Sequence, residues 1–343
     1  MKIFLFSEKQ KTLKKSGIGR ALYHQMKALE LNGIEYTLNS IDKYDIIHIN
    51  TIFSKSFKML KKAKKNNMPV IVHGHSTKED FLNSFRFSKQ LSTWFNKCLI
   101  RMYANADLII TPTSYSKKLI SNYKEVNCEI VNISNGIDLE TFLNDSNFSQ
   151  SEIDELNRKM HLENREKYVL GIGMYFARKG LHDFIEVAKS FPNIKFVWLG
   201  QKYRFLTSSI INKAIKHKTS NVIFPGYLSE REVRIALKNA KVFFFPSYEE
   251  TEGIVVLEAL ASKTPVLIRN IGVFNDWLID GENCFKADNN IQFVQKINFI
   301  LENSLSDLTN EGLKVVEKRT LLEVGKQLKQ EYQKLLKTKH IEL

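Results

Sequence analysis

The sequence predicts an α/β protein built from two doubly wound domains. First, its 343 residues exceed one small domain and suit two domains of ordinary size. Second, short apolar runs alternate with helix-like segments, which is typical of a parallel sheet covered by helices. Third, the alternation stops in the polar stretch 143–166 and then starts again. We expect the two domains to enclose a cleft at the carboxyl ends of their strands, where sheets of this kind bind ligands.

The first predicted domain covers residues 1–142. Helix-like segments are expected after a glycine-containing loop at 16–20, at 54–66 and at about 80–104, and the first of these helices stops at Gly33. The apolar runs between them predict buried strands at 2–7, 44–50, 69–75, 107–113 and 129–134.

The second predicted domain covers residues 167–319 and follows a polar linker, 143–166, which is expected to hold a short helix. A helix is expected from Lys179, and the segment 320–343 is a candidate to pack back on the first domain. Predicted strands lie at 168–173, 194–200, 221–226, 241–247 and 264–268.

Composition excludes several classes of protein. With 43% hydrophobic and 26% charged residues the chain is not a disordered protein. No apolar run reaches the roughly 18 to 20 residues that a membrane-spanning helix needs. Three cysteines far apart indicate neither a disulfide framework nor a zinc ribbon. The first residues lack the pattern of a secretory signal, so we expect a cytoplasmic protein, soluble or peripheral on the inner face of the cell membrane.

The positive charge is concentrated in the first domain. The whole chain has 51 Lys and Arg against 37 Asp and Glu, a net +14. Residues 1–140 hold 22 basic and 12 acidic residues, a net +10, which leaves +4 for the rest. Such asymmetry suggests a polyanionic partner, either nucleic acid or an anionic membrane. Because no helix-turn-helix, RNP-like or zinc pattern accompanies the charge, no nucleic-acid partner is expected.

The segment 243–268 carries the most informative pattern. A buried strand leads into an acidic loop, and Gly253 opens a helix that contains Glu258 within an apolar run. Acids near a helix start commonly complement its positive end, which accounts for Glu250 or Glu252 but poorly for Glu258. An unpaired buried carboxylate is costly, so a ligand is the better explanation. Carboxylates eight residues apart could accept hydrogen bonds from sugar hydroxyls while the helix N-terminus faces a phosphate.

Together with other short motifs, this segment resembles the family 4 retaining glycosyltransferases, which have the GT-B fold. The resemblance covers nearly the whole chain. The motifs that carry it are Glu250-x7-Glu258 with Gly253 and the following Ala-Leu-Ala-Ser-x-x-Pro-Val, the loop 16–20, His75, Asn135-Gly136-Ile137-Asp138, and Arg178-Lys179-Gly180.

The resemblance implies a role for several residues of the second domain. Glu258 would bind the ribose of a nucleotide sugar, and Glu250 would hold hydroxyls of the donor sugar beside the backbone of Gly253. Arg178 and Lys179 would neutralise the diphosphate. Many relatives carry Gly-Arg-Leu where this chain has Gly-Met-Tyr at 173–175, so one phosphate-binding arginine is missing. Arg178 is a candidate to compensate, because a guanidinium binds phosphate bidentately.

In the first domain the resemblance assigns a loop and a histidine to the donor site. Gly17 and Gly19 would approach the donor phosphates, since glycine permits close contact between backbone and phosphate. A plain strand-to-helix turn is the structural alternative. His75 would line the donor-sugar site as a catalytic residue, although a lone histidine after a buried strand is more often part of the core.

The expected reaction needs a UDP-sugar as co-substrate and no cofactor. Because no Asp-x-Asp follows a strand, no metal is expected to bind the diphosphate. Cations and a helix N-terminus would stabilise the charge on the departing diphosphate. The family implies retention, with the acceptor hydroxyl attacking from the side of the leaving group and no side-chain nucleophile.

Three stretches, 14–29, 44–51 and 73–88, resemble bacterial enzymes that add a second hexose to monoglucosyldiacylglycerol. This implies a UDP-hexose donor, glucose or galactose, a glycolipid acceptor and an anionic membrane surface. The residues expected to face the acceptor or membrane are Lys58, Lys61, Lys62, Lys65, Phe85, Arg86, Trp94 and Phe95. The structural alternative is that these aromatics pack a core and these lysines form a solvated face. Two other functions stay open: transfer to a soluble, polysaccharide or undecaprenyl-linked acceptor in capsule or wall synthesis, and non-catalytic nucleotide-sugar binding.

Overall fold

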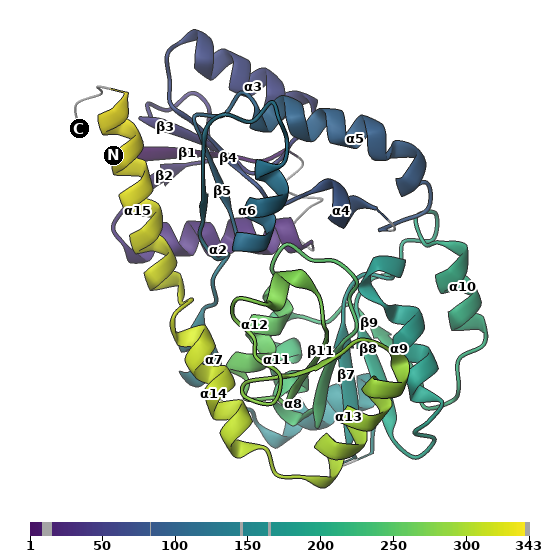
Figure 1. The fold of residues 1–343 in the computed structure, drawn as a ribbon. Helices are drawn as coiled ribbons and strands as arrows, with labels where there is room; N and C mark the ends of the chain where they lie inside the picture. Colours follow the sequence, from purple (N-terminus) through teal and green to yellow (C-terminus); the bar gives the residue numbers. More distant parts are fainter. Residues whose placement is uncertain (9–15, 83, 145–146, 164–165, 340–343) are drawn as a thin grey trace. The chain divides into compact units, whose positions relative to one another are not determined.

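The computed structural model describes residues 1–8, 16–82, 84–144, 147–163 and 166–339 (Figure 1). The chain forms two compact units. Unit 1 contains Met1–Phe81, Leu91–Asp138 and Lys318–Leu343, and unit 2 contains Leu82–Gln90 and Leu139–Glu317. Each unit is built on a parallel sheet with helices around it, which is the predicted fold class.

The sheet of unit 1 has the strand order β2-β1-β3-β4-β5-β6, and its paired strands run parallel. Its central strands consist mainly of Ile, Val and Leu and are buried on both faces, as expected for a sheet covered by helices. The strands are β1 (Lys2–Phe6), β2 (Glu35–Thr37), β3 (Ile46–Ile49), β4 (Val70–His73), β5 (Leu108–Thr111) and β6 (Glu129–Asn132). The helices are α2 (Gly17–Leu31), α3 (Ser54–Lys65), α4 (Lys78–Phe81), most of α5 (Ser88–Tyr103), α6 (Ser114–Ser121) and α15 (Leu321–Thr338).

Helix α15 belongs to unit 1 although it lies at the end of the chain. It packs along α2, and its Leu328 and Tyr332 are buried in the same core as β1 and β3. A Cβ atom on Gly325 would lie 2.2 Å from the carbonyl oxygen of Ala28, so a glycine is needed where the two helices approach. The first unit therefore takes one of its core helices from a distant part of the sequence.

The sheet of unit 2 has the order β12-β11-β10-β7-β8-β9, again parallel throughout. Aromatic side chains fill its core, among them Phe184, Trp198 and Phe244. The strands are β7 (Tyr168–Ile172), β8 (Lys195–Leu199), β9 (Val222–Gly226), β10 (Val242–Phe245), β11 (Val266–Arg269) and β12 (Phe285–Ala287). The helices are α7 (Leu139–Asn144), α8 (Gln150–Lys159), α9 (Leu181–Ala188), α10 (Ser209–Lys216), α11 (Glu230–Asn239), α12 (Ile254–Ala261), α13 (Asn290–Glu302) and α14 (Ser306–Glu317), with short 3₁₀ turns η1 (Ala177–Lys179) and η2 (Gly272–Phe274).

The structure corrects three details of the sequence analysis. The single helix expected at 80–104 is two helices, α4 and α5, because Phe87 has a φ of +71° that no α-helix accommodates. Strands β2 and β12 were not predicted, since three residues are too few to show a periodicity. The compact units also divide the chain differently from the predicted domains, because residues 82–90 lie in unit 2 rather than with the rest of 1–142.

Among the described residues, no helix is both long enough and apolar enough to span a bilayer.

Candidate functional site

The acidic loop of unit 2 follows the central strand β10. Strand β10 ends at Phe245, and the loop after Pro246 approaches the turn that joins η1 to α9. At that turn Gly180 has a φ of +72°, and a Cβ atom there would lie 2.2 Å from the Pro246 carbonyl oxygen. Only glycine fits this crossing, which brings Lys179 beside Glu250 although the two residues are 71 positions apart.

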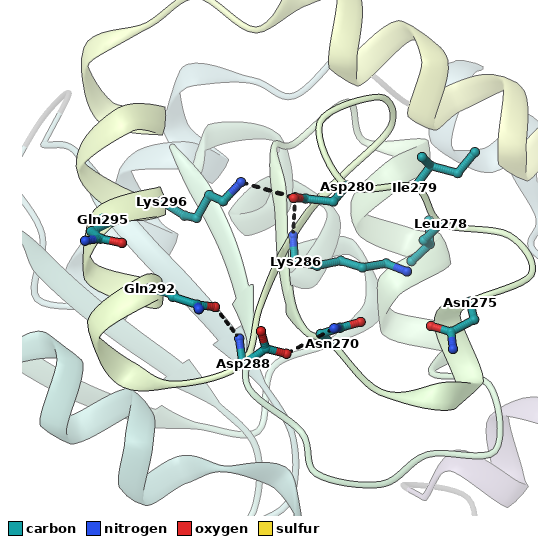
Figure 2. A pocket seen from close by; sticks show the side chains of 10 residues that line it. All are labelled: Asn270, Asn275, Leu278, Ile279, Asp280, Lys286, Asp288, Gln292, Gln295 and Lys296. Atoms are coloured by element: carbon teal, nitrogen blue, oxygen red, sulfur yellow. Dashed lines mark hydrogen bonds and ion pairs between the residues drawn. The ribbon is translucent and has the colours of Figure 1, made fainter.

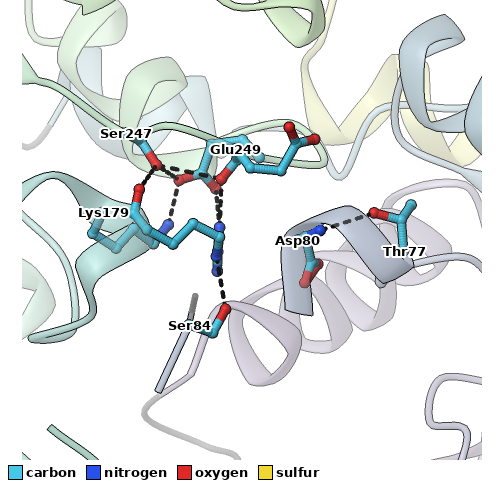
Figure 3. A network of polar contacts seen from close by, with 8 residues as sticks. Thr77, Asp80, Ser84, Lys179, Ser247 and Glu249 are labelled. Atoms are coloured by element: carbon cyan, nitrogen blue, oxygen red, sulfur yellow. Dashed lines mark hydrogen bonds and ion pairs between the residues drawn. The ribbon is translucent and has the colours of Figure 1, made fainter. Parts of the chain in front are cut away.

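Lys179 and Glu250 form a largely buried ion pair. The Lys179 ammonium donates to the Glu250 carboxylate at 2.5 Å, with 15% and 8% of the two side chains exposed. The Ser247 hydroxyl donates to the same carboxylate oxygen at 2.6 Å (Figure 3). Burial alone would raise the pKa of Glu250, but the charges of Lys179 and Arg178 with these hydrogen bonds lower it below its ordinary value. Glu250 is therefore ionised at neutral pH.

Arg178 also contacts the acidic loop. Its Nε donates to the Ser84 hydroxyl at 2.9 Å and one terminal nitrogen donates to the Glu249 carbonyl at 2.5 Å. The same terminal nitrogen lies 3.6 Å from Glu250. Arg178 thus joins the loop to residues 82–90 within unit 2. Its predicted role as a substitute phosphate ligand stays a prediction.

Helix α12 begins at Ile254, after the N-cap residue Gly253, which has a positive φ and no side chain that could cap the helix. Its first turn contains no acidic residue, but Glu252 directly precedes Gly253, so the alternative in which the loop acids complement the helix start stays open. Glu258 lies in the second turn among apolar neighbours and is 3% exposed, while Glu252 is 1% exposed. The backbone N–H groups at the start of a helix suit an anion.

A second polar network, formed by Arg269, Asp183 and Tyr248, contacts the same loop and was not predicted. Arg269 donates to Asp183 at 2.6 Å and to the Pro246 carbonyl at 3.1 Å. The hydroxyl of Tyr248 also donates to Asp183 at 2.6 Å, and the Arg269 guanidinium lies 4.0 Å from the Tyr248 ring centre. Burial and the bond to Asp183 raise the pKa of Tyr248 to about 12. An arginine at the end of an otherwise apolar strand was the available sequence signal.

In unit 1, His75 lies at the edge of a buried cluster of histidines. Its Nε2 is 3.0 Å from the Asn50 side-chain oxygen, and its ring stacks on His73 at 3.9 Å. His73 in turn lies 3.2 Å from His48. Burial lowers the pKa of His75 and of His48 to about 3, and burial with the neighbouring imidazoles lowers the pKa of His73 well below its ordinary value. All three imidazoles are therefore neutral at neutral pH.

Amide side chains fix the proton positions in this cluster. Asn50 donates its amide N–H to the Gln25 oxygen at 3.0 Å, which leaves the Asn50 oxygen to accept from Nε2 of His75. The Gln25 amide lies 2.8 Å from His48, which is also 2.8 Å from the Tyr332 hydroxyl on α15. The arrangement gives His75 a protonated Nε2 and an Nδ1 that can accept a hydrogen bond. Gln25, Asn50 and Tyr332 were not predicted, because their spacing in the sequence shows no pattern.

The glycine loop of the sequence analysis is the start of helix α2. Ser16 caps the helix by accepting from the Gly19 backbone N–H at 3.3 Å, so Gly17 and Gly19 lie in the first turn rather than in a loop. A Cβ atom on Gly17 would meet open space. Packing therefore does not require a glycine at 17.

The residues predicted to face the acceptor or membrane have different environments. Trp94 is 53% exposed and stacks on Phe53, and Phe85 is half-buried beside Phe176. Phe95 is 4% exposed and stacks on Phe81 at 3.8 Å, so its predicted surface position is wrong: it faces the core of unit 1. The predicted basic residues are all exposed: Lys58, Lys61, Lys62, Lys65 and Arg86.

Unit 2 also contains a polar cavity of about 550 Å³ between the ends of β11 and β12 and helix α13 (Figure 2). Four carboxamide side chains line it, Asn270, Asn275, Gln292 and Gln295, together with charged groups such as Lys286. None of the predicted site residues lines this cavity. The predicted residues Arg178, Lys179 and Glu250 lie together elsewhere in unit 2, after β10, and their role in binding the donor stays a prediction.

Two family models match the chain, "Glycosyltransferase Family 4" over residues 16–141 and "Glycosyl transferases group 1" over residues 152–315. A processive diacylglycerol alpha-glucosyltransferase from Acholeplasma laidlawii is 46% identical over 99% of this chain and all of its own length. The chain belongs to the family 4 glycosyltransferases. As a family 4 glycosyltransferase it is an enzyme, and its fold is GT-B.

More distant proteins are similar in sequence or in fold. An alpha-monoglucosyldiacylglycerol synthase from A. laidlawii is 26% identical over 88% of this glycosyltransferase and 76% of its own length. Anabaena HepE, solved in complex with UDP and glucose, superimposes with a TM-score of 0.77 at 16% identity, covering 97% of this chain and all of HepE. Sucrose-phosphate synthase from Thermosynechococcus elongatus gives 0.71 at 19% identity, over 86% and 74% of the two chains.

Proposed function

We propose that this glycosyltransferase transfers a hexose, with retention, from a UDP-sugar to a diacylglycerol-based glycolipid. Monoglucosyldiacylglycerol is the proposed acceptor and a diglycosyl-diacylglycerol the product. The observation that carries the proposal is the 46% identity with a processive diacylglycerol alpha-glucosyltransferase over the full length of both chains. Because that relative is an alpha-glucosyltransferase, glucose is favoured over galactose as the transferred sugar.

The residues of unit 2 suit the donor half of this reaction. Glu250 is ionised and held by Lys179, so its carboxylate can accept hydrogen bonds from sugar hydroxyls. The Lys179 ammonium and the backbone N–H groups at the start of α12 would offset the charge that develops on the departing diphosphate. Glu258 would bind the ribose.

The acceptor hydroxyl would attack from the side of the leaving group and pass its proton to the diphosphate oxygen. No step needs a metal ion or a side-chain nucleophile. In unit 1, His75 would line the sugar site with Nδ1 as its acceptor atom, because Asn50 occupies its other nitrogen.

We further propose that the enzyme acts while bound peripherally to the inner face of the cell membrane. The support is the exposed lysine face of α3, with Lys58, Lys61, Lys62 and Lys65, and the exposed ring of Trp94 in the same unit. Such a surface is attracted to anionic lipid by about 1 kcal/mol per basic residue.

The test is direct. The purified protein is incubated with UDP-glucose or UDP-galactose and with diacylglycerol or monoglucosyldiacylglycerol in mixed micelles, and the lipid products are identified by mass spectrometry. The proposal expects a lipid that is one hexose heavier, with much less product from the Glu250→Gln variant. The Lys189→Met variant, which removes an exposed lysine of the same unit, serves as the control. Transfer only to a soluble or undecaprenyl-linked acceptor would refute the lipid assignment.

A further inference from the structure

We propose that unit 2 carries its own membrane-docking surface, separate from the lysine face of α3, at which exposed aromatic and basic side chains contact anionic lipid headgroups. We name it the unit 2 docking surface and define it by Arg86, Phe87, Arg204, Phe205 and Leu206. The inference rests on the proposed function, because an enzyme whose acceptor is a membrane lipid has to bind the bilayer surface.

The overall charge of unit 2 hides this feature. Residues 139–317, which form most of unit 2, contain 22 Lys and Arg against 23 Asp and Glu, a net −1, yet residues 201–221 contain five Lys and Arg and no acidic residue. The remainder of 139–317 therefore carries −1 − 5, or −6. The segment 82–90 adds Arg86 and Lys89, again without an acid. Basic charge in unit 2 is thus gathered around one loop and the segment that the structure places beside it.

Apolar side chains are exposed at the same place. Phe205 is 84% exposed, Phe87 is 55% exposed and Leu206 is 42% exposed. The turn that presents Phe205 is well formed, because the backbone N–H groups of Leu206 and Thr207 both donate to the Tyr203 carbonyl at 2.9 Å. Large apolar groups held outward on an ordered turn have no role in the core of the unit.

One hydrogen bond joins the two segments into a single surface. The Arg86 backbone N–H donates to the Leu206 carbonyl at 2.8 Å, so the segment 82–90 lies beside the turn. Two residues earlier, Ser84 accepts from Arg178, which contacts the loop of Glu250. The docking surface is therefore linked through consecutive contacts in unit 2 to the candidate donor site.

Charge and shape favour a bilayer as the occupant. Exposed rings flanked by arginines, without acidic residues in either segment, match an interface in which rings enter the headgroup region and cations meet lipid phosphates. The Arg86 guanidinium lies 4.9 Å from the Phe87 ring centre, so charge and ring are presented together. An acidic protein partner or a second copy of the chain would need the same charges, and the experiment separates these occupants.

The test measures binding of the full-length protein to vesicles by flotation at low salt. Vesicles of phosphatidylcholine alone are compared with vesicles containing phosphatidylglycerol. We expect the Phe87→Ser, Phe205→Ser double variant to bind the anionic vesicles about tenfold more weakly, and Arg204→Gln about fivefold more weakly. The matched control is Ile291→Ser, which removes a 74% exposed apolar side chain elsewhere in unit 2 and should leave binding unchanged.

Two further measurements make the outcome decisive. Circular dichroism and thermal unfolding establish that each variant is folded. Wild-type hexose transfer to a lipid acceptor in detergent micelles tests the proposed function without a bilayer, so the two proposals can fail separately. Flotation of the double variant equal to that of the control overturns the docking surface. A wild-type self-association that the double variant abolishes, with flotation unchanged, overturns it in favour of a second copy.

Discussion

Replacing Lys179 by methionine tests the ion pair on which the donor site depends. The change keeps most of the side-chain volume but leaves the buried Glu250 carboxylate with the Ser247 hydroxyl and with Arg178 at 3.6 Å. Breaking a buried pair typically costs about 3–5 kcal/mol. Because Arg178 remains, we expect a loss of about 2–3 kcal/mol in the free energy of unfolding. For a unit of this size that corresponds to a melting temperature lower by about 5–10 °C.

The lowered pKa of Glu250 predicts how the effect of this substitution on stability changes with pH. The folded pKa of Glu250 lies below its unfolded value of 4.5, so the ion pair stabilises the wild type above that pH and the contribution is lost as pH falls through the folded pKa. In the variant, the charged Glu250 carboxylate is buried without Lys179, which costs free energy. Protonation of the carboxylate at low pH removes this cost. The difference in melting temperature between wild type and variant should therefore be largest near pH 8 and shrink near pH 4.

The assay is thermal unfolding followed by circular dichroism, with two matched variants. Lys189→Met removes an exposed pair with Glu186 and should cost no more than about 0.5 kcal/mol. The double variant Lys179→Met, Glu250→Gln removes both charges and should be more stable than Lys179→Met alone. If Lys179→Met lowers the melting temperature no more than Lys189→Met does, or by the same amount at pH 8 and pH 4, the Lys179–Glu250 pair does not contribute the stability expected of a buried ion pair.

Three further predictions follow from the other sites. Glu258→Gln should lower kcat/KM for hexose transfer at least tenfold with little change in melting temperature, and activity within a few-fold of wild type would remove it from the site. Asn50→Ala should release Nε2 of His75, which nitrogen-15 NMR of the imidazole would detect as a mixture of tautomers; an unchanged spectrum would contradict the assignment. Because the buried His73 has a lowered pKa, the unfolded state binds its proton first, and stability should fall below about pH 6.5. Since His48 and His75 contribute to the same fall, His73→Gln should make it less steep in melting curves without abolishing it, and an equally steep fall would exclude a contribution from His73.

The sequence alone determined that the protein has two α/β domains and that the second contains the acidic motif. Runs such as that of β4 are apolar on both faces, and this local property specifies a buried parallel strand without reference to the rest of the chain. The spacing of Glu250 and Glu258 around Gly253 is likewise a local pattern. The resemblance to family 4 glycosyltransferases could therefore be recognised from the sequence, and the relative that is 46% identical over 99% of the chain confirms the family.

Only the tertiary structure decided which groups meet. Lys179 and Glu250 are 71 residues apart, and Tyr332 reaches His48 across 284 residues, so no local window contains either pair. Phe95 and Trp94 are neighbours in an aromatic segment, yet one is buried and the other exposed, because consecutive helix positions point in directions about 100° apart. Periodicity specifies elements, whereas packing between distant segments selects the partners and the exposed face.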